Sequence, residues 1–193
     1  MPTTNNLPNK TYVFGVDDCK IFPVTKDAEG QFTCGAGIDV PGIKQISLTP
    51  TVELKTLTGD EVTLATKVKQ PDIAVTLEFA ELSLSVLAAL TGGTVSVETG
   101  KTTFRVEEGN DPPYFQLQAQ IKGVDYAGDM HIVIYKAKYS NAPINGTEDD
   151  FTTFSIDCTG AYTDCKWGNS KGRLWEIKEN ETATDLSAVT FSA

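Results

Sequence analysis

The feature of this sequence that most constrains its fold is a near-strict alternation of apolar and polar side chains in three separate segments. Residues 45–54, 72–79 and 114–123 change between an apolar and a polar or small residue at almost every position. Successive side chains of a β-strand point to opposite faces, so this pattern predicts half-buried strands. The same reasoning predicts strands at 130–139 and 151–158, and shorter ones at 12–16, 20–24, 94–98, 102–107, 173–178 and 188–191.

One segment, residues 81–90, has helical spacing instead. Leu84, Leu87 and Leu90 fall near one face of a helix. Ser83 is placed to cap its start, and the glycines after Thr91 are placed to end it. We therefore expect a mainly β protein, with two packed antiparallel sheets in a β-sandwich or curled barrel, flanked by one α-helix. Residues 1–193 are expected to form a single domain, because the chain has no evident linker or internal repeat.

The sequence argues against three broad classes of protein. The longest apolar run, residues 86–90, is far shorter than the roughly 20 residues that span a bilayer. The first residues have neither the basic cluster nor the apolar stretch of a secretory signal, so no export is expected. Twenty-six acidic and 16 basic side chains give a net charge of -10, and no cluster of Lys and Arg stands out. A protein that grips DNA is therefore not expected either.

Residues that could carry catalysis are few. His131 is the single histidine, and it is predicted to share a strand face with Val133 and Tyr135, where it packs rather than acts as a base. Adjacent acidic residues on a strand point to opposite faces, so they do not form a catalytic pair. A calcium site could be drawn from Asn110, Asp111, Asp125 and Asp129, but these residues do not have the spacing of a calcium loop. We expect no enzyme activity, no metal and no cofactor.

The four cysteines also give no sign of a metal site. They have no Cys-x-x-Cys spacing, and a single histidine cannot complete the usual zinc ligand sets. Without an export signal they are expected to be reduced thiols. A Cys19–Cys34 or Cys158–Cys165 disulfide is the alternative.

A long connection separates the first two alternating segments. Residues 55–71 carry a turn signal at residues 58–61 and only weak alternation. A connection of this length inside a compact domain is usually functional or mobile. The alternative is a twisted hairpin packed on its own domain.

The order of these elements resembles that of the major tail tube proteins of long non-contractile-tailed, siphovirus-type bacteriophages. The resemblance rests on residues 14–24, 40–48 and 73–79, and on the helix ending in Gly92-Gly93, and it covers about residues 12–160. It implies homohexameric rings that stack into a hollow tube, surround a tape-measure protein and conduct DNA during ejection. It leaves about residues 161–193 as a C-terminal extension, without the immunoglobulin-like domain that many members carry.

The resemblance also implies partners and a location. The partners are further copies of the same chain, the tape-measure protein, and the distal tail and tail terminator proteins. DNA would pass without specific binding, and no membrane is involved. The location is the tail of the virion, after assembly in the cytoplasm of the bacterial host.

Two sets of residues acquire roles from this resemblance. The connection is expected to reach a neighbouring subunit or ring, with apolar side chains buried only after assembly, through Leu57, Thr58, Gly59, Asp60, Glu61, Val62, Leu64 and Val68. Polar strand faces are candidates for the lumen wall, with ordinary solvent faces as the alternative: Gln45, Ser47, Thr49, Glu53, Asp72, Thr76, Glu78, Gln116, Gln118 and Gln120. An acidic or neutral wall repels phosphate and lets DNA slide.

Two other functions remain alternatives at this stage. A soluble carbohydrate-binding β-sandwich would need exposed aromatic side chains, for which Trp167 and Trp175 are the candidates. A decoration protein of the same virions is the second.

Overall fold

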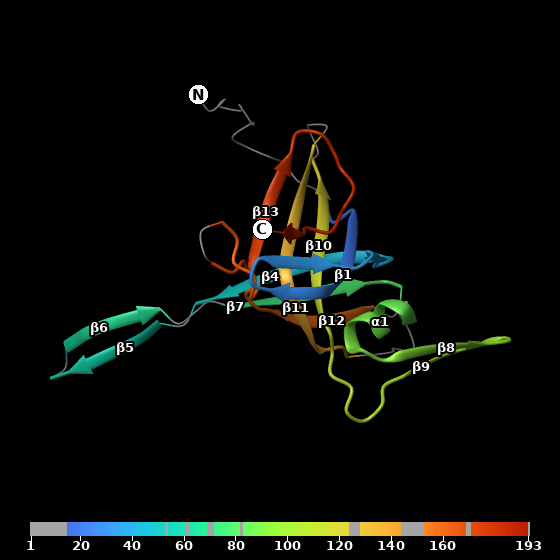
Figure 1. The fold of residues 1–193 in the computed structure, drawn as a ribbon, viewed down its shortest axis with the longest axis horizontal. Helices are drawn as coiled ribbons and strands as arrows, with labels where there is room; N and C mark the ends of the chain where they lie inside the picture. The colour runs from blue at the N-terminus through green and yellow to red at the C-terminus, as the bar shows by residue number, and fades with distance from the viewer. Residues whose placement is uncertain are drawn as a thin grey trace.

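The computed structural model describes residues 15–52, 54–60, 62–68, 72–81, 83–123, 128–143, 153–168 and 171–192. Most of them lie in antiparallel strands, with one α-helix, so the expected fold class is confirmed (Figure 1). The elements are β1 (Asp18–Ala28), β2 (Gln31–Cys34), β3 (Ile38–Asp39), β4 (Ile43–Thr51), β5 (Leu54–Gly59), β6 (Val62–Val68), β7 (Asp72–Phe79), α1 (Leu84–Thr91), β8 (Thr94–Glu98), β9 (Lys101–Arg105), β10 (Tyr114–Lys122), β11 (Asp129–Asn141), β12 (Phe154–Gly160), β13 (Trp175–Asn180) and β14 (Phe191–Ser192).

One large sheet forms the body of the molecule. Its strand order is β14-β2-β1-β10-β11-β12-β7-β4, and β3 and β13 pair with β1 and β11. β13 pairs with the first half of β11 and β12 with its end, so the two strands follow each other along β11. An irregularity in the β10–β11 register accompanies a bend, and β10 and β13 run across the direction of β7 and β4 in Figure 1. The sheet therefore packs on itself, and it does not close into a barrel within the described residues.

The core lies on the apolar face of this sheet. Cross-strand neighbours such as Ile46, Leu77 and Ile156 form rows across β4, β7 and β12. These rows join apolar residues of β1, β10 and β11 in one buried cluster. The alternation in the sequence predicted this face correctly for 72–79 and 114–123, but for 45–54 only as far as Leu48, because Val52 and Leu54 are exposed.

The helix covers part of the core where the sheet leaves it open. Ser83 caps its N-terminus by accepting a hydrogen bond from the amide of Val86. Gly92 ends it in the left-handed conformation, with φ of 74° and its N–H bonded to the carbonyl of Ala88. The predicted start and end of the helix are therefore confirmed. Within the described residues, no helix has the length and apolar character needed to cross a membrane.

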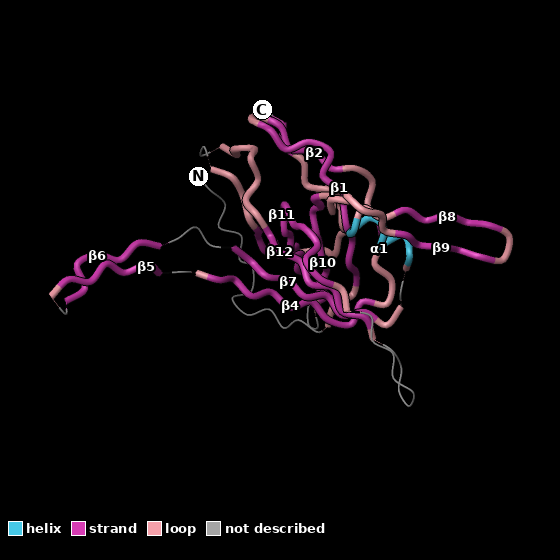
Figure 2. The backbone as a smooth tube through the Cα atoms, turned by 90° about the horizontal axis from the view of Figure 1, so that it is seen from below, coloured by secondary structure: helices cyan, strands magenta, loops and turns pink. Residues whose placement is uncertain are grey.

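Two hairpins project from opposite sides of the body. The β5–β6 hairpin stands apart from the large sheet, and the β8–β9 hairpin extends beyond α1 (Figures 1 and 2). Each is a separate two-stranded sheet. Residues 54–68 are therefore neither a loop nor a hairpin packed on its own domain.

The remaining expectations meet mixed outcomes. Strand 12–16 falls largely outside the described residues, and residues 15–17 are not a strand. The chain beyond residue 160 returns to the body, because β13 pairs with β11 and β14 with β2. All four cysteines are free thiols, so neither alternative disulfide forms.

Candidate functional site

An open polar face covers the β4–β7–β12 end of the sheet. Two rows of cross-strand neighbours define it, and both cross all three strands: Gln45, Glu78 and Ser155, then Ser47, Thr76 and Asp157. Thr49 and Thr159 flank Ala74, and Thr51 faces Asp72 beyond them. We call these residues the open polar face. Its described residues are exposed or half-buried, so short polar side chains meet solvent over three adjacent strands.

The charge on this face is negative. Asp72, Glu78 and Asp157 lie on it, and Thr76 holds Asp157 through a hydrogen bond of 2.7 Å from its hydroxyl to the carboxylate. The nearest cation on the neighbouring strand, Lys138, is already paired with Asp111 at 2.6 Å. The polar residues that define the face are therefore carboxylates, hydroxyls and one amide, and no cation is among them.

The open polar face ends at an unpaired strand edge. Among the described strands β4 pairs only with β7, so its other edge is free. Pro50 lies in β4, which fits an edge strand because proline has no N–H to donate to a ladder. An edge of this kind is a place where another strand can pair.

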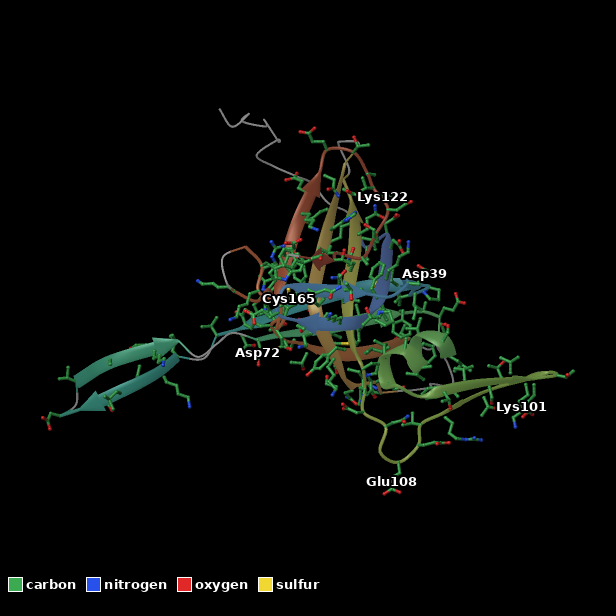
Figure 3. The ribbon with its side chains drawn as sticks, viewed as in Figure 1. Asp39, Asp72, Lys101, Glu108, Lys122 and Cys165 are labelled. Carbon is green, nitrogen blue, oxygen red and sulfur yellow. The ribbon has the colours of Figure 1, made fainter. Side chains whose placement is uncertain are left out.

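The β5–β6 hairpin leads away from this same end. Asp72, at the start of β7, lies where the chain returns from the hairpin (Figure 3). Leu54, Leu57 and Val62 are 63%, 63% and 61% exposed. An isolated two-stranded hairpin is marginally stable in water. Large apolar side chains on it stay exposed to water until another surface covers them.

Not every predicted residue of the hairpin can be placed. Thr58 and Asp60 are described, and Asp60 has a positive φ of 50° at the turn. Glu61 and Glu53 lie outside the described residues. For Gly59, Leu64 and Val68 the structure describes the strand but not the side chain.

Three of the predicted lumen residues are in the wrong place for that role. Gln116, Gln118 and Gln120 are 0%, 1% and 7% exposed, because residues 184–190 of the same chain cross over them. The alternation of β10 was correct, but its polar face is covered, not open. The prediction that these three glutamines line a lumen is therefore wrong in this structure.

Asp129 anchors one end of that cover, a role that differs from the calcium-ligand alternative in which the sequence placed it. Its carboxylate is fully buried and accepts hydrogen bonds from the Gln120 amide, the His131 ring at 2.9 Å, the Thr184 amide at 2.9 Å and the Asn180 amide at 2.7 Å. Burial alone would raise the pKa of Asp129, but these hydrogen bonds outweigh it and lower the pKa to about 2. No pattern marked it for this role, because its partners lie on three other segments.

His131 is used by the same arrangement. Its Nε2 lies 2.9 Å from the Asp129 carboxylate and 3.1 Å from the Thr184 carbonyl, and both are acceptors. The Nε2 nitrogen therefore carries the proton, and its N–H donates a hydrogen bond to these acceptors. His131 shares its strand face with Val133 and Tyr135, as predicted.

A second buried carboxylate, that of Asp27, joins the end of β1 to the chain after β12. Lys136 lies 2.7 Å from both Asp27 and Asp164. Asp27 also accepts hydrogen bonds from the backbone amides of Asp164 and Cys165. Burial alone would raise the pKa of Asp27, but the hydrogen bonds from Lys136 and these amides lower it below its usual value.

The residues of the alternative functions do not come together. Trp167 is buried, packs against Phe191 with ring centroids 4.6 Å apart and lies under the Arg173 guanidinium, while Trp175 is 39% exposed on β13. They form no shared aromatic platform. Among the described residues no group of three or more His, Cys, Asp or Glu side chains is placed to hold a metal ion. Asp125, a member of the calcium alternative, lies outside the described residues.

The comparisons with known proteins add a likeness in fold. No protein-family model matches the sequence, and no curated protein sequence matches it. Eight chains of solved structures match the fold. One belongs to the cryo-EM structure of the anti-feeding prophage baseplate, 6-fold symmetrised, with a TM-score of 0.50 over 88% of this chain and 97% of that chain. At 9% sequence identity this likeness concerns the fold alone.

Proposed function

We propose that this chain is a non-enzymatic, self-assembling structural subunit of a phage tail, and specifically of a tail tube. Six copies form a ring, rings stack into a hollow tube, and the tube surrounds a tape-measure protein and later conducts DNA. The observation that carries the proposal is the open polar face, which is acidic and ends at an unpaired strand edge. The likeness in fold between this chain and a chain of a 6-fold symmetrised prophage baseplate supports a phage structural role.

Pairing between copies would turn this face into the wall of a channel. β4, β7, β12 and the end of β11 are four adjacent strands, so six copies supply 24. With strands about 4.8 Å apart and tilted, such a barrel is roughly 40 to 50 Å across at the backbone. After side chains are added, a DNA duplex can pass.

The chemistry of the face suits passage rather than binding. Asp72, Glu78 and Asp157 repel phosphate, and no cation is among the residues that define the open polar face. Gln45, Ser47, Thr49, Asp72, Thr76 and Glu78 are the predicted lumen residues that this face retains.

The β5–β6 hairpin is the proposed contact with the next subunit or ring. Its exposed apolar side chains gain most from burial against another copy. In the virion, the other partners of such a tube would be the distal tail and tail terminator proteins. A carbohydrate-binding module is not favoured, because only one of the two tryptophans is exposed.

Electron microscopy of the concentrated protein tests the proposal. We expect sixfold rings or tubes from the unmodified chain. The variants Leu57→Asp and Val62→Asp should lose stacked tubes, whereas Thr56→Asp and Thr63→Asp add the same charge to exposed polar positions of the hairpin and should keep them.

Three outcomes would contradict the proposal or one part of it. Monomers at every concentration, together with no sixfold particle in virions, would exclude the tube. Binding to the outside of capsids would favour a decoration protein instead. Normal-length tubes after deletion of residues 57–66 would refute the role of the hairpin alone.

A further inference from the structure

The segment that covers the three glutamines is bound in an unusual way. It contains residues 183–190, has no strand partner of its own over that length, and runs antiparallel to β10. We call it the C-terminal strap. The surface beneath it, formed by Gln116, Gln118, Gln120, Asp129 and His131, we call the glutamine face.

Side-chain amides on the glutamine face replace the backbone of a neighbouring strand. The Gln116 amide donates to the Val189 carbonyl at 3.0 Å and accepts from the Val189 N–H at 2.8 Å, as two paired peptide groups would. Two residues further along β10, the Gln118 amide donates to the Ser187 carbonyl at 2.7 Å. The Gln118 amide also donates to the Gln116 amide oxygen at 2.7 Å, which fixes the orientation of both groups.

The other end of the strap is held in the same manner. Gln120 donates to the Thr184 carbonyl at 2.9 Å, and Asp129 accepts from the Thr184 N–H at 2.9 Å. All these contacts are made to main-chain atoms of the strap. The glutamine face therefore recognises an extended backbone, and most of its hydrogen bonds do not depend on the side chains that the strap carries.

Two apolar side chains fix the register of the strap. Leu186 is 6% exposed, and Phe191, just beyond the strap, packs against Trp167 with ring centroids 4.6 Å apart. Ser187, between them, is exposed. The strap is therefore held in two ways: by hydrogen bonds to its backbone, which do not depend on its sequence, and by these two apolar side chains.

The connection to the strap is exposed. Glu181, Thr182 and Ala183 are solvent-exposed and join β13 to the first strap contact at Thr184. A segment that is joined by an exposed connector and held by contacts to its backbone can be exchanged between identical chains at low cost, because every contact is reproduced in the partner.

We propose that the glutamine face is a binding site for an extended segment, and that the C-terminal strap of a second copy occupies it when copies are held side by side. Within one copy the strap occupies its own face. Neighbours in an assembly raise the effective concentration of a second strap, and reciprocal exchange then links the copies without new contacts. This inference does not require the assembly to be a tube.

The backbone readout is tested on the full chain after folding. A protease site inserted between Glu181 and Thr182 allows the strap to be cut from folded protein and displaced by a fluorescent peptide of residues 183–192. We expect saturable binding by fluorescence anisotropy. Methylation of the Val189 amide nitrogen in the peptide should weaken binding about tenfold, because it removes the donor to Gln116. The Ser187→Ala peptide is the matched control and should bind unchanged.

Exchange between copies is tested with a pair of complementary chains. The cut protein offers an accessible face. A full-length Gln116→Leu, Gln118→Leu chain offers a strap whose own face is disabled. We expect a one-to-one complex of the two by sedimentation. Full-length Gln45→Leu carries the same change on the open polar face, keeps its strap, and should form about tenfold less complex.

The results separate the two parts of the inference. Equal binding of the methylated and unmethylated peptides would overturn the backbone readout. The unmodified full chain at high concentration is a second donor, in case the double variant does not fold. Absence of a complex with both donors would overturn exchange, whether or not tubes form.

Discussion

Replacing Asp129 with Asn tests how the C-terminal strap is fastened. The buried carboxylate accepts four hydrogen bonds, whereas an asparagine side chain offers one oxygen and turns its other group into a donor. At least one of the surrounding donors then faces another donor. Loss of hydrogen bonds to a buried charge costs about 1.5–3 kcal/mol each, so we expect the variant to be about 3–5 kcal/mol less stable at pH 7.

The pH dependence gives a second, independent signature. Asp129 has its pKa lowered from 3.8 to about 2, so its stabilising contribution is complete above the unfolded pKa and is lost as pH falls through the folded one. The shift corresponds to about 2.5 kcal/mol in total, of which about 1.5 kcal/mol is lost by pH 2.5. The stability difference between the wild-type protein and the Asn variant should narrow by that amount between pH 6 and pH 2.5.

Urea unfolding followed by tryptophan fluorescence measures both quantities. Trp167 lies against Phe191, just beyond the strap, and therefore reports on its release. Asp111→Asn is the matched control, since it removes a carboxylate that is 83% exposed and pairs only at the surface, and it should change stability by less than about 1 kcal/mol. Parallel pH profiles for wild type and Asp129→Asn, or a loss below 1 kcal/mol at pH 7, would refute the reasoning.

Three further predictions follow from other parts of the structure. Asp27→Asn leaves buried Lys136 with one exposed partner and should cost about 2–4 kcal/mol at pH 7 in urea unfolding; because the pKa of Asp27 is lowered, this loss should shrink as pH falls below about 4, and a pH-independent loss would contradict the assignment. Burial raises the pKa of the Cys34 thiol to about 11, so at pH 8 it should react with iodoacetamide about 100-fold more slowly in native than in unfolded protein, and equal rates would contradict its burial. Gly92→Ala should lower the thermal unfolding midpoint, at a cost of about 1–2 kcal/mol, because φ is 74° and the new Cβ would lie 3.2 Å from the Asp111 carbonyl oxygen; an unchanged midpoint would contradict the helix end.

Much of the body of this fold could be predicted from the sequence because its strands bury one face. β7 was predicted at the residues where it forms, and the helix was predicted with its Ser83 and Gly92 caps. β4 ends earlier than its pattern, at Thr51, because the chain leaves the sheet there for the hairpin. The alternation of apolar and polar residues in the sequence continues beyond Thr51, although its apolar side chains have no core to pack against there.

The β8–β9 hairpin was predicted as two short strands, but the β5–β6 hairpin and the strap were harder to predict for a physical reason. Hydrophobic alternation reports burial of one face within a subunit, and the β5–β6 hairpin has no such face, so its pattern is weak. The sequence predicted a strand at 188–191, but only Phe191 and Ser192 form one, because side-chain amides of β10 hold the backbone of the strap before them. Segments whose partners are not backbone strands of the same sheet leave little signal in the sequence.

The chemistry of a polar strand face nevertheless distinguishes an open face from a covered one. On β4 and β7 the polar positions are mostly occupied by short hydroxyls and carboxylates, which water satisfies completely. On β10 they are three glutamines, whose amides carry N–H donors and a carbonyl acceptor, the same kinds of group as a peptide bond, at the end of a side chain long enough to reach over the sheet. Three such amides at alternate positions form a substitute strand edge, which favours a covering backbone over water once anchors such as Leu186 are buried with it. Glutamines at every second position of an otherwise well-buried strand therefore predict a segment lying across that face, not a surface facing solvent or a lumen.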